Sequence, residues 1–229
     1  MNELTNFIRD KLLCHGADLV GFGDLTELPD EVRHGLPVGI SVAVKYPPEV
    51  IAGIGELPTP EYRGWYLRLN GRLDMLVTLG AEALERLGYR AVAQTRARVG
   101  FGEDSDVTAL PHKTVATRAG LGWIGKSALL VTREWGSLIR LSSILTDAPL
   151  EVAGPVNRSN CGACMICTEA CPAGAISGRE WALGLYRDAF FDAVKCRRTA
   201  EERSLLGFGG GDTICGKCIA VCPYTRKCL

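Results

Sequence analysis

The sequence predicts an α/β domain with a mixed sheet, followed by a small cysteine-rich domain. Helix-like and strand-like patterns alternate along roughly the first two thirds of the chain, which is typical of an α/β domain. Cysteine content then changes abruptly, because residues 1–160 contain one cysteine and residues 161–229 contain nine. A stretch with two prolines at 148–155 is typical of a connection. We therefore expect two domains, at residues 1–155 and 156–229.

The chain is expected to begin with an amphipathic helix that ends near Gly16, since its apolar residues recur on one helical face. Cys14 in this helix is expected to be a small buried hydrophobe. Two strands are expected to follow at residues 18–23 and 39–45, because apolar side chains alternate along the second.

A long helix is expected next. Pro60 suits its first turn and Gly88 suits its end, with apolar residues at helical spacing between them. A strand is expected at residues 89–94. Residues 127–132 and 138–146 are expected to form a hairpin, because two apolar runs flank a short turn that ends in glycine.

Charge and hydropathy exclude several classes of function. Lysine plus arginine and aspartate plus glutamate each number 26, so the chain has no basic surplus for general nucleic-acid binding. The N-terminal residues lack a signal-peptide pattern and no apolar run is long enough to span a membrane, so we expect a cytoplasmic protein. Because disulfides are rare in that reducing compartment, ten cysteines indicate metal binding instead.

Two cysteine motifs indicate iron–sulfur clusters. The first motif is Cys161-x2-Cys164-x2-Cys167-x3-Cys171-Pro172. The second motif is Cys215-x2-Cys218-x3-Cys222-Pro223. Three thiolates at the first spacing hold one cubane, and the fourth cysteine, before proline, is typical of a ligand to a second cubane. Structural zinc with four thiolates is the alternative, which the run before proline disfavours.

The two motifs supply seven thiolates, whereas two [4Fe–4S] clusters need eight. Cys196 is the expected eighth ligand, with Cys228 as the alternative. The crossed arrangement would place one cluster on Cys161, Cys164, Cys167 and Cys222. It would place the other on Cys171, Cys196, Cys215 and Cys218. Such clusters carry single electrons and form no bonds themselves, so a further reactive centre is expected in the first domain.

A glycine-rich segment is the second informative feature. It reads Ala119-Gly120-Leu121-Gly122-Trp123-Ile124-Gly125-Lys126. Closely spaced glycines allow the backbone to approach a ligand. The segment also matches the spacing of dinucleotide-binding and phosphate-binding loops. Here, however, it is expected to follow a helix and precede a strand, which reverses the order that both of those loops require.

This segment resembles part of the cobalamin-dependent epoxyqueuosine reductases. The resemblance extends to Arg133-Glu134-x-Gly136-Ser137, Leu145-Thr146-Asp147 and Cys161 through Ile176. The core of that family is similar to that of reductive dehalogenases. The resemblance implies a nitroreductase-like domain that holds a corrinoid with its lower base displaced. It also implies a ferredoxin-like domain that brings electrons, and an aspartate that donates a proton. Residues 119–126 would then bind the corrinoid, with a flavin as the alternative cofactor.

The longer members of that family continue into a helical-repeat domain that helps to hold tRNA, whereas this sequence ends six residues after Pro223. It therefore resembles a short relative without that domain. We expect it to reduce a small substrate with electrons from ferredoxin or flavodoxin, and we do not expect tRNA as a partner. The alternative is an electron relay that reduces a corrinoid protein and has no substrate of its own.

The residues of proton transfer follow from the resemblance. Aligned without gaps, the family aspartate falls on Asp106, and with a two-residue insertion it falls on Asp104. The family's active-site arginine falls on Lys113, and His112 replaces a glutamate. His112 is a second candidate proton donor, because an unperturbed histidine has a pKa near neutrality. Otherwise, His112 and Lys113 would be a solvated pair at the start of a helix.

Overall fold

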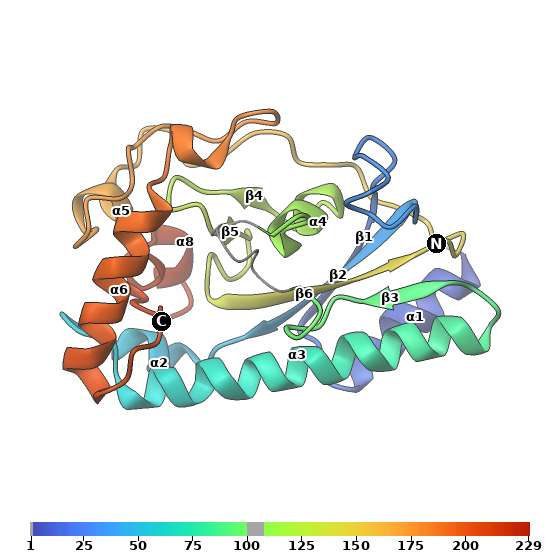
Figure 1. Ribbon diagram of the computed structural model, residues 1–229, viewed down its shortest axis with the longest axis horizontal. Coiled ribbons are helices and arrows are strands. Elements are labelled where there is room, and N and C mark those ends of the chain that lie inside the picture. The colour runs from blue at the N-terminus through green and yellow to red at the C-terminus, as the bar shows by residue number, and fades with distance from the viewer. Residues whose placement is uncertain (1, 100–107) are drawn as a thin grey trace. The chain divides into compact units, whose positions relative to one another are not determined.

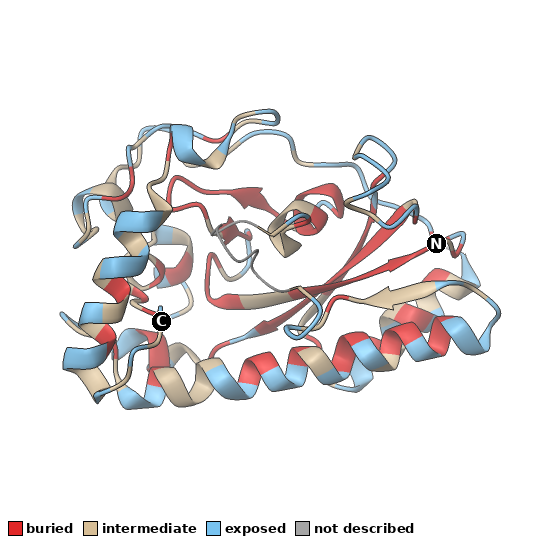
Figure 2. Cartoon of the chain, viewed as in Figure 1, coloured by how far each residue is buried: buried red, intermediate tan, exposed pale blue. Residues whose placement is uncertain are grey.

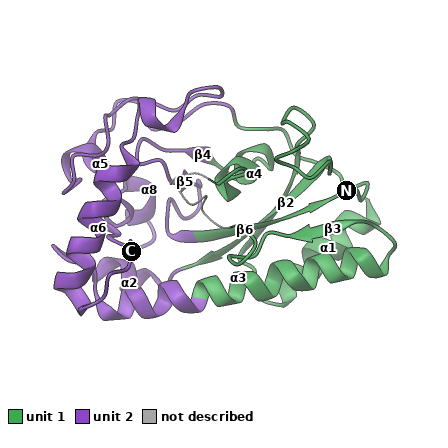
Figure 3. Ribbon diagram, viewed as in Figure 1, with its two compact units in different colours: residues 1–45, 69–122, 140–156 green, residues 46–68, 123–139, 157–229 purple. Residues whose placement is uncertain are grey.

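The computed structural model describes residues 2–99 and 108–229, and Figure 1 shows the order of its helices and strands. The chain forms two compact units, each assembled from three stretches of sequence (Figure 3). Unit 1 comprises residues 1–45, 69–122 and 140–156, and unit 2 comprises residues 46–68, 123–139 and 157–229. This grouping differs from the single boundary expected after residue 155, because residues 46–68 and 123–139 group with the C-terminal part.

Unit 1 is built on a four-stranded sheet with the strand order β1-β2-β6-β3. The strands are β1 (Leu19–Asp24), β2 (Val38–Lys45), β3 (Ala91–Ala93) and β6 (Ile139–Thr146). The β1–β2 and β3–β6 pairs are antiparallel, with Phe22 opposite Ile40 and Val92 opposite Leu145. All four strands lie where the sequence pattern predicts them, to within two residues at each end, and the α/β class is confirmed.

Different helices cover the two faces of this sheet. They are α1 (Glu3–Cys14) and most of α3 (Pro60–Arg86) on one face and α4 (His112–Arg118) on the other. On β1, the ring of Phe22 faces α1, where the Arg9 guanidinium lies 5.1 Å from the ring centre. The next residue, Gly23, faces the end of α4, since a Cβ there would lie 2.6 Å from the backbone nitrogen of Ala119. Glycine therefore permits the close approach of α4 to the sheet.

Apolar packing on both faces stabilises unit 1. On the α4 face, five buried side chains form one cluster: Leu25, Leu36, Leu110, Val115 and Leu145. On the other face, Leu12 of α1 and Ile144 of β6 both lie against Gly80 of α3. Figure 2 shows that buried and exposed residues alternate along α3, as its amphipathic sequence predicts.

Unit 2 contains short elements joined by irregular chain. Its helices are α2 (Pro48–Ala52), the start of α3, α5 (Ile166–Glu169), η1 (Arg187–Ala189), α6 (Ala193–Phe208), α7 (Lys217–Ala220) and α8 (Pro223–Arg226). Its two strands, β4 (Trp123–Ile124) and β5 (Leu130–Val131), form a small antiparallel pair. A small apolar cluster consists of Ile124, Ala128, Trp181 and Phe190. None of the helices in the described part of the chain is both long and apolar enough to cross a membrane.

The hairpin expected from residues 127–132 and 138–146 is only partly present. A tight turn forms where expected, since the backbone groups of Thr132 and Gly136 exchange two hydrogen bonds of 2.9 and 3.1 Å. The strands on its two sides belong to different sheets, because β5 pairs with β4 and β6 joins the larger sheet. The pairing of these strands was therefore predicted wrongly, because an alternating pattern identifies a strand but not its partner.

Candidate functional site

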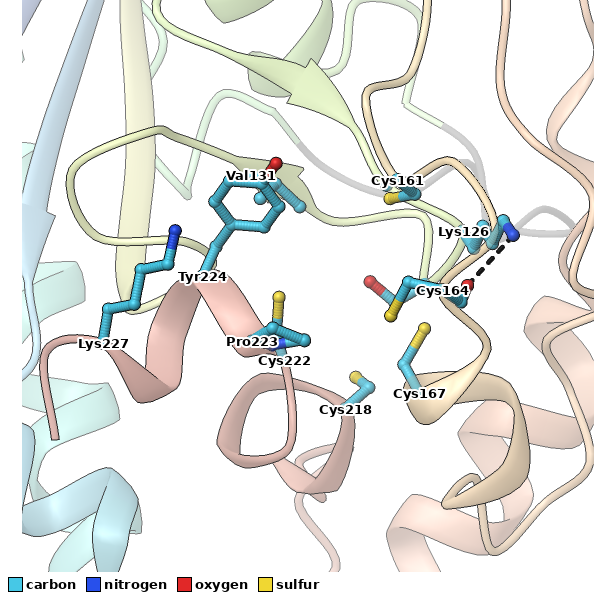
Figure 4. Close-up of a pocket in the computed structure, with 12 residues that line it drawn as sticks. Lys126, Val131, Cys161, Cys164, Cys167, Cys218, Cys222, Pro223, Tyr224 and Lys227 are labelled. Atoms are coloured by element: carbon cyan, nitrogen blue, oxygen red, sulfur yellow. Dashed lines mark hydrogen bonds between the residues drawn. The ribbon is translucent and has the colours of Figure 1, made fainter.

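Five cysteines of unit 2 line one pocket of about 310 Å³, the first pocket, and one of them is Cys218. The other four are Cys161, Cys164, Cys167 and Cys222. Cys161 and Cys164 precede α5, Cys167 lies in it, and Cys222 is the residue before α8. Figure 4 shows their sulfur atoms around a common space, with Lys126, Val131 and Tyr224 beside it.

A second, smaller pocket of about 90 Å³ contains the other group of four cysteines. They are Cys171, Cys196, Cys215 and Cys218, and α6 and α7 carry two of them. Ser127 and Cys218 line both pockets, so the two pockets share part of a wall. The structure thus brings eight cysteines together around two adjoining pockets, and the assignment of each cysteine to one cluster stays a prediction.

The electrostatics of these thiols suit a positively charged metal centre. Burial raises the pKa of Cys167 to about 11, with the nearby Cys161 and Cys222 adding to the effect. Burial likewise raises the pKa of Cys196 to about 11, with contributions from Cys171 and Cys215. Four neighbouring thiolates therefore cost free energy unless metal ions compensate their charge.

A cubane and a single zinc ion require different positions of their four sulfur ligands. All ten cysteines are free thiols. Within residues 2–99 and 108–229, no three His, Cys, Asp or Glu side chains lie close enough to bind one metal ion. A zinc ion would draw four sulfur atoms to about 2.3 Å from its centre, whereas a cubane holds its ligands at the corners of a larger cage.

The two remaining cysteines lie elsewhere. The thiol of Cys228 donates to the carbonyl oxygen of Glu134 at 2.9 Å, and Cys228 lines neither of the two cysteine pockets. Cys14 is exposed on α1, so its expected burial was wrong. Leu12, two positions earlier, is fully buried, and a helix turns far enough in two residues to place Cys14 on the solvent side.

The glycine-rich segment is divided between the two units. Residues 119–122 follow α4 in unit 1, and the turn at Gly120 has a φ of +69°, which favours glycine. Residues 123–126 begin unit 2, where Gly125 and Lys126 line the first pocket. The expected order of helix, segment and strand is confirmed. Corrinoid binding by residues 119–126 stays a prediction, and the last two of them contact the cysteine site.

The loop that continues from this segment into β5 is strained. Ser127 and Leu129 line the second pocket, so the loop contributes to both pockets. Between them, Ala128 has a φ of +60°, a conformation that a residue with a Cβ rarely adopts. Such strain is common at functional sites, where the surrounding structure holds the backbone in place.

The candidate proton donors can be placed only in part. Asp104 and Asp106 lie outside the described residues. His112 begins α4, is half-buried, and its Nδ1 lies 2.9 Å from the hydroxyl of Ser143. Burial, assisted by the positive charge of Arg140, lowers the pKa of His112 to about 4. The ring is therefore neutral at pH 7, and the near-neutral pKa that made it a candidate acid was wrong.

Lys113 follows His112 at the start of α4 and is half-buried, as His112 is. The two residues are therefore not the fully solvated pair considered as an alternative. A role for either in catalysis stays a prediction.

Three polar residues of unit 1 were missed by the sequence analysis. Arg140 donates from Nε and Nη2 to the side-chain oxygen of Asn70, at 3.1 and 2.9 Å. In the described structure, the side-chain nitrogens of Asn70 and Gln94 are buried without a hydrogen-bond partner. Buried donors are normally paired, so such atoms are candidates to bind a ligand. The available signal was a polar residue, Asn70, beside the apolar stripe of α3.

The fold and the two cysteine groups define a two-unit protein with a double iron–sulfur site. Residues 160–225 match the family described as "4Fe-4S double cluster binding domain", so this region is a domain for two [4Fe–4S] clusters. The chain is also 32% identical over 222 residues to the epoxyqueuosine reductase of Pseudomonas aeruginosa, covering 91% of this chain and 56% of that protein. It is 30% identical over 204 residues to that of Escherichia coli, covering 89% and 52%. The chain is therefore a relative of the epoxyqueuosine reductases and spans about half their length.

Solved structures show the same fold. Epoxyqueuosine reductase from Streptococcus thermophilus matches with a TM-score of 0.62 and 22% identity, over 99% of this chain and 67% of that chain. The catabolic reductive dehalogenase NpRdhA, in complex with 3-bromo-4-hydroxybenzoic acid, matches with a TM-score of 0.68 and 20% identity, over 92% and 30%. Both likenesses confirm the fold that the sequence resemblance implies.

The grouping of cysteines predicts the iron content. We expect about eight irons per chain after anaerobic reconstitution, as two cubanes require, measured by iron and sulfide analysis. Cys196→Ser should lower the content to about four, because Cys196 lines the second pocket. Cys14→Ser and Cys228→Ser are the controls and should retain the parental iron content. If Cys228→Ser loses iron and Cys196→Ser does not, the assignment of the eighth ligand is wrong.

The lowered pKa of His112 predicts that the free energy of unfolding depends on pH. Its pKa is about 4 in the folded protein and near 6.5 in the unfolded chain. As the pH falls below 6.5, the unfolded state binds the proton first, so the folded state loses stability. We expect His112 to account for a loss on the order of 2 kcal/mol between pH 7 and pH 5, measured by urea unfolding.

His112→Asn should remove most of that pH dependence, because asparagine can replace the contact of Nδ1 without titrating. The control is His34→Asn, since His34 is exposed and has a φ of +54° that asparagine tolerates. Equal pH dependence in the parent and in both variants would contradict the lowered pKa.

Proposed function

We propose that this chain is a corrinoid-dependent iron–sulfur reductase. Electrons would pass through two [4Fe–4S] clusters in unit 2 to a base-off corrinoid, which would reduce a small substrate. The observation that carries this proposal is the pair of adjoining cysteine-lined pockets, which share Ser127 and Cys218. Two clusters side by side form a path for single electrons, and a protein that contains such a path needs a redox centre to receive them.

The proposed ligands are the two groups of four cysteines. Cys161, Cys164, Cys167 and Cys222 would hold the first cluster, and Cys171, Cys196, Cys215 and Cys218 would hold the second. The raised pKa values of Cys167 and Cys196 support this, because iron supplies the positive charge that these buried thiolates need. The backbone N–H of Ala175 donates to the sulfur of Cys171 at 3.4 Å, a type of contact that tunes a cluster's potential.

Unit 1 has donors that fit a corrinoid. The unpaired side-chain nitrogens of Asn70 and Gln94 could donate to the carbonyl oxygens of the amide side chains around a corrin ring. The backbone of residues 119–124, with its closely spaced glycines, remains the second candidate contact. When bound, the cobalt would supply a strong nucleophile or a one-electron reductant. One similar solved structure, that of a reductive dehalogenase, is described as suggesting a mechanism for B12-dependent dehalogenation, which supports the choice of cofactor.

The proposed proton donor is Asp106, with Asp104 as the alternative. A carboxyl group can donate near neutral pH only if its surroundings raise its pKa, so burial beside the bound substrate is required. His112 is neutral and hydrogen-bonded to Ser143, which suits an orienting contact better than proton donation. Lys113 would provide positive charge near the site.

The electron donor is proposed to be reduced ferredoxin or flavodoxin. Helix α6 carries Cys196 together with three cationic neighbours, Lys195, Arg197 and Arg198, whose side chains are exposed. Lys195 also pairs with Asp192 at 3.5 Å. The positive charge of this exposed segment beside a cysteine of the second pocket suits an acidic partner, because charge complementarity raises the rate of encounter.

Two other functions are favoured by particular observations. The relatives are named epoxyqueuosine reductases, and one similar structure, with a TM-score of 0.61, contains an epoxyqueuosine-modified tRNA stem loop. A tRNA-borne substrate is therefore the main rival to a small substrate. The adjoining clusters would equally serve an electron relay that reduces a corrinoid protein, and a flavin could replace the corrinoid on the same fold.

Cobalamin binding tests the proposed function directly. We expect cobalamin added to the cluster-loaded protein to bind with its lower base displaced, which shifts the cobalt absorption bands in an anaerobic titration. Gly122→Val should weaken this binding, because a Cβ and two methyl groups would fill space beside the backbone. Gly71→Val is the control, since Gly71 is exposed and a Cβ there meets no atom within 4 Å.

Two results would contradict the proposal that the chain binds a corrinoid through this segment. One is tight retention of a flavin through purification with no spectral response to cobalamin. The other is equal cobalamin binding by the parent and by Gly122→Val, which would remove residues 119–124 from the site.

Binding and turnover assays distinguish a tRNA-borne substrate from a small one. We expect weak binding of an epoxyqueuosine-modified tRNA stem loop at physiological salt, because the chain has no surplus of positive charge. Free epoxyqueuosine nucleoside is the matched small-molecule probe. For any substrate that is reduced, Asp106→Asn should lower the rate by about 10²–10⁴-fold and leave iron content and cobalamin binding unchanged.

Nanomolar binding of the stem loop, with conversion to queuosine, would show that tRNA is the substrate. If neither probe is reduced and Asp106→Asn reduces cobalt as fast as the parent, the relay is the better account.

A further inference from the structure

Lys126 is a buried cation beside the first pocket. It follows Gly125 in the loop after β4, and only 4% of its surface is exposed. Its Nζ lies 2.8 Å from the carbonyl oxygen of Gly162, 3.0 Å from that of Cys164 and 3.5 Å from the sulfur of Met165. Figure 4 shows Lys126 reaching the Cys164 segment. All three partners are acceptors, which matches an ammonium group with three N–H donors and no acceptor.

These contacts fix the segment that carries three of the five cysteines of the first pocket. Gly162, Cys164 and Met165 all lie between Cys161 and Cys167. The same segment is held from a second direction, because the backbone N–H of Gly162 donates to Glu180 at 2.6 Å. Lys126 therefore acts on the sulfur atoms through the backbone that positions them.

The second pocket has a different electrostatic environment. Its lysine, Lys217, pairs with Glu56 at 3.2 Å and also donates to the carbonyl oxygen of Gly55 at 3.1 Å. The described contacts of Lys126 are with carbonyl and thioether groups, which carry no net charge. Lys227 also lines the first pocket, and Lys195, Arg197 and Arg198 are close in sequence to Cys196 of the second, but all four cations are exposed to solvent. Water screens an exposed charge far more than a buried one.

An added electron makes a cluster more negative, and a buried positive charge nearby stabilises that state. We propose that Lys126 makes the cluster in the first pocket the more easily reduced of the two. This inference rests on the cluster ligation proposed above. An electron given up by a reduced one-electron carrier to the second cluster would then pass favourably to the first, with no proton transferred.

The test uses the full chain, reconstituted anaerobically and titrated with dithionite and redox mediators while the reduced clusters are followed by EPR. Lys126→Gln removes the charge and keeps an N–H donor. We expect it to shift one of the two midpoint potentials to a more negative value and to leave the other unchanged. Lys126→Arg keeps the charge and should remain closer to the parent. Lys227→Gln removes an exposed charge from the same pocket and should cause a much smaller shift.

The outcomes are distinct. Unchanged potentials in Lys126→Gln, or an equal shift in Lys227→Gln, would overturn the proposal. Loss of about four irons from Lys126→Gln would show that Lys126 holds the first cluster in place rather than setting its potential, and would overturn the proposal. Loss of all iron from both variants would show that Lys126 supports the fold of unit 2 rather than one cluster, and would also overturn it. Fewer than eight irons in the parent would contradict both the proposed cluster ligands and this proposal. Failure to bind cobalamin would contradict the proposed function but would leave this test valid.

Discussion

The arrangement of unit 2 depends on the placement of eight thiols in two half-buried groups. Apart from α6 and the start of α3, the helices of this unit are short, and its strand pair has two residues in each strand. Burial and mutual repulsion raise the pKa values of Cys167 and Cys196, which makes neighbouring thiolates costly without metal. The folding of this unit is therefore expected to be coupled to the binding of its clusters.

Unit 1 differs from unit 2 because it contains polar groups buried within an apolar core. Close contact of α4 with the sheet at Gly23 fixes the start of the glycine-rich segment that follows the helix. On the same helix, His112 stays neutral against Ser143. Asn70 and Gln94 retain buried nitrogens without partners. A core that tolerates such groups is consistent with a site that a ligand completes.

The sequence was most informative where spacing along the chain decides geometry. The two cysteine runs predicted which part of the chain binds two clusters, because short spacings place sulfur atoms close together whatever the surrounding fold. Residues whose role depends on distant neighbours were predicted poorly. The pKa of His112 is set by burial and Arg140, and the contacts of Lys126 are made 36 to 39 positions away. The partner of β5 also depends on tertiary packing, which no local pattern records.

The shared wall between the pockets has a consequence for how the double site can change in evolution. Each cysteine run contributes to both groups, and Cys218 lies where the pockets meet. With the proposed ligands, deleting either run would therefore remove ligands from both centres instead of leaving one intact. A single-cluster descendant would need new ligands from elsewhere in the chain. The two centres are thus expected to be gained, kept or lost as one inherited unit.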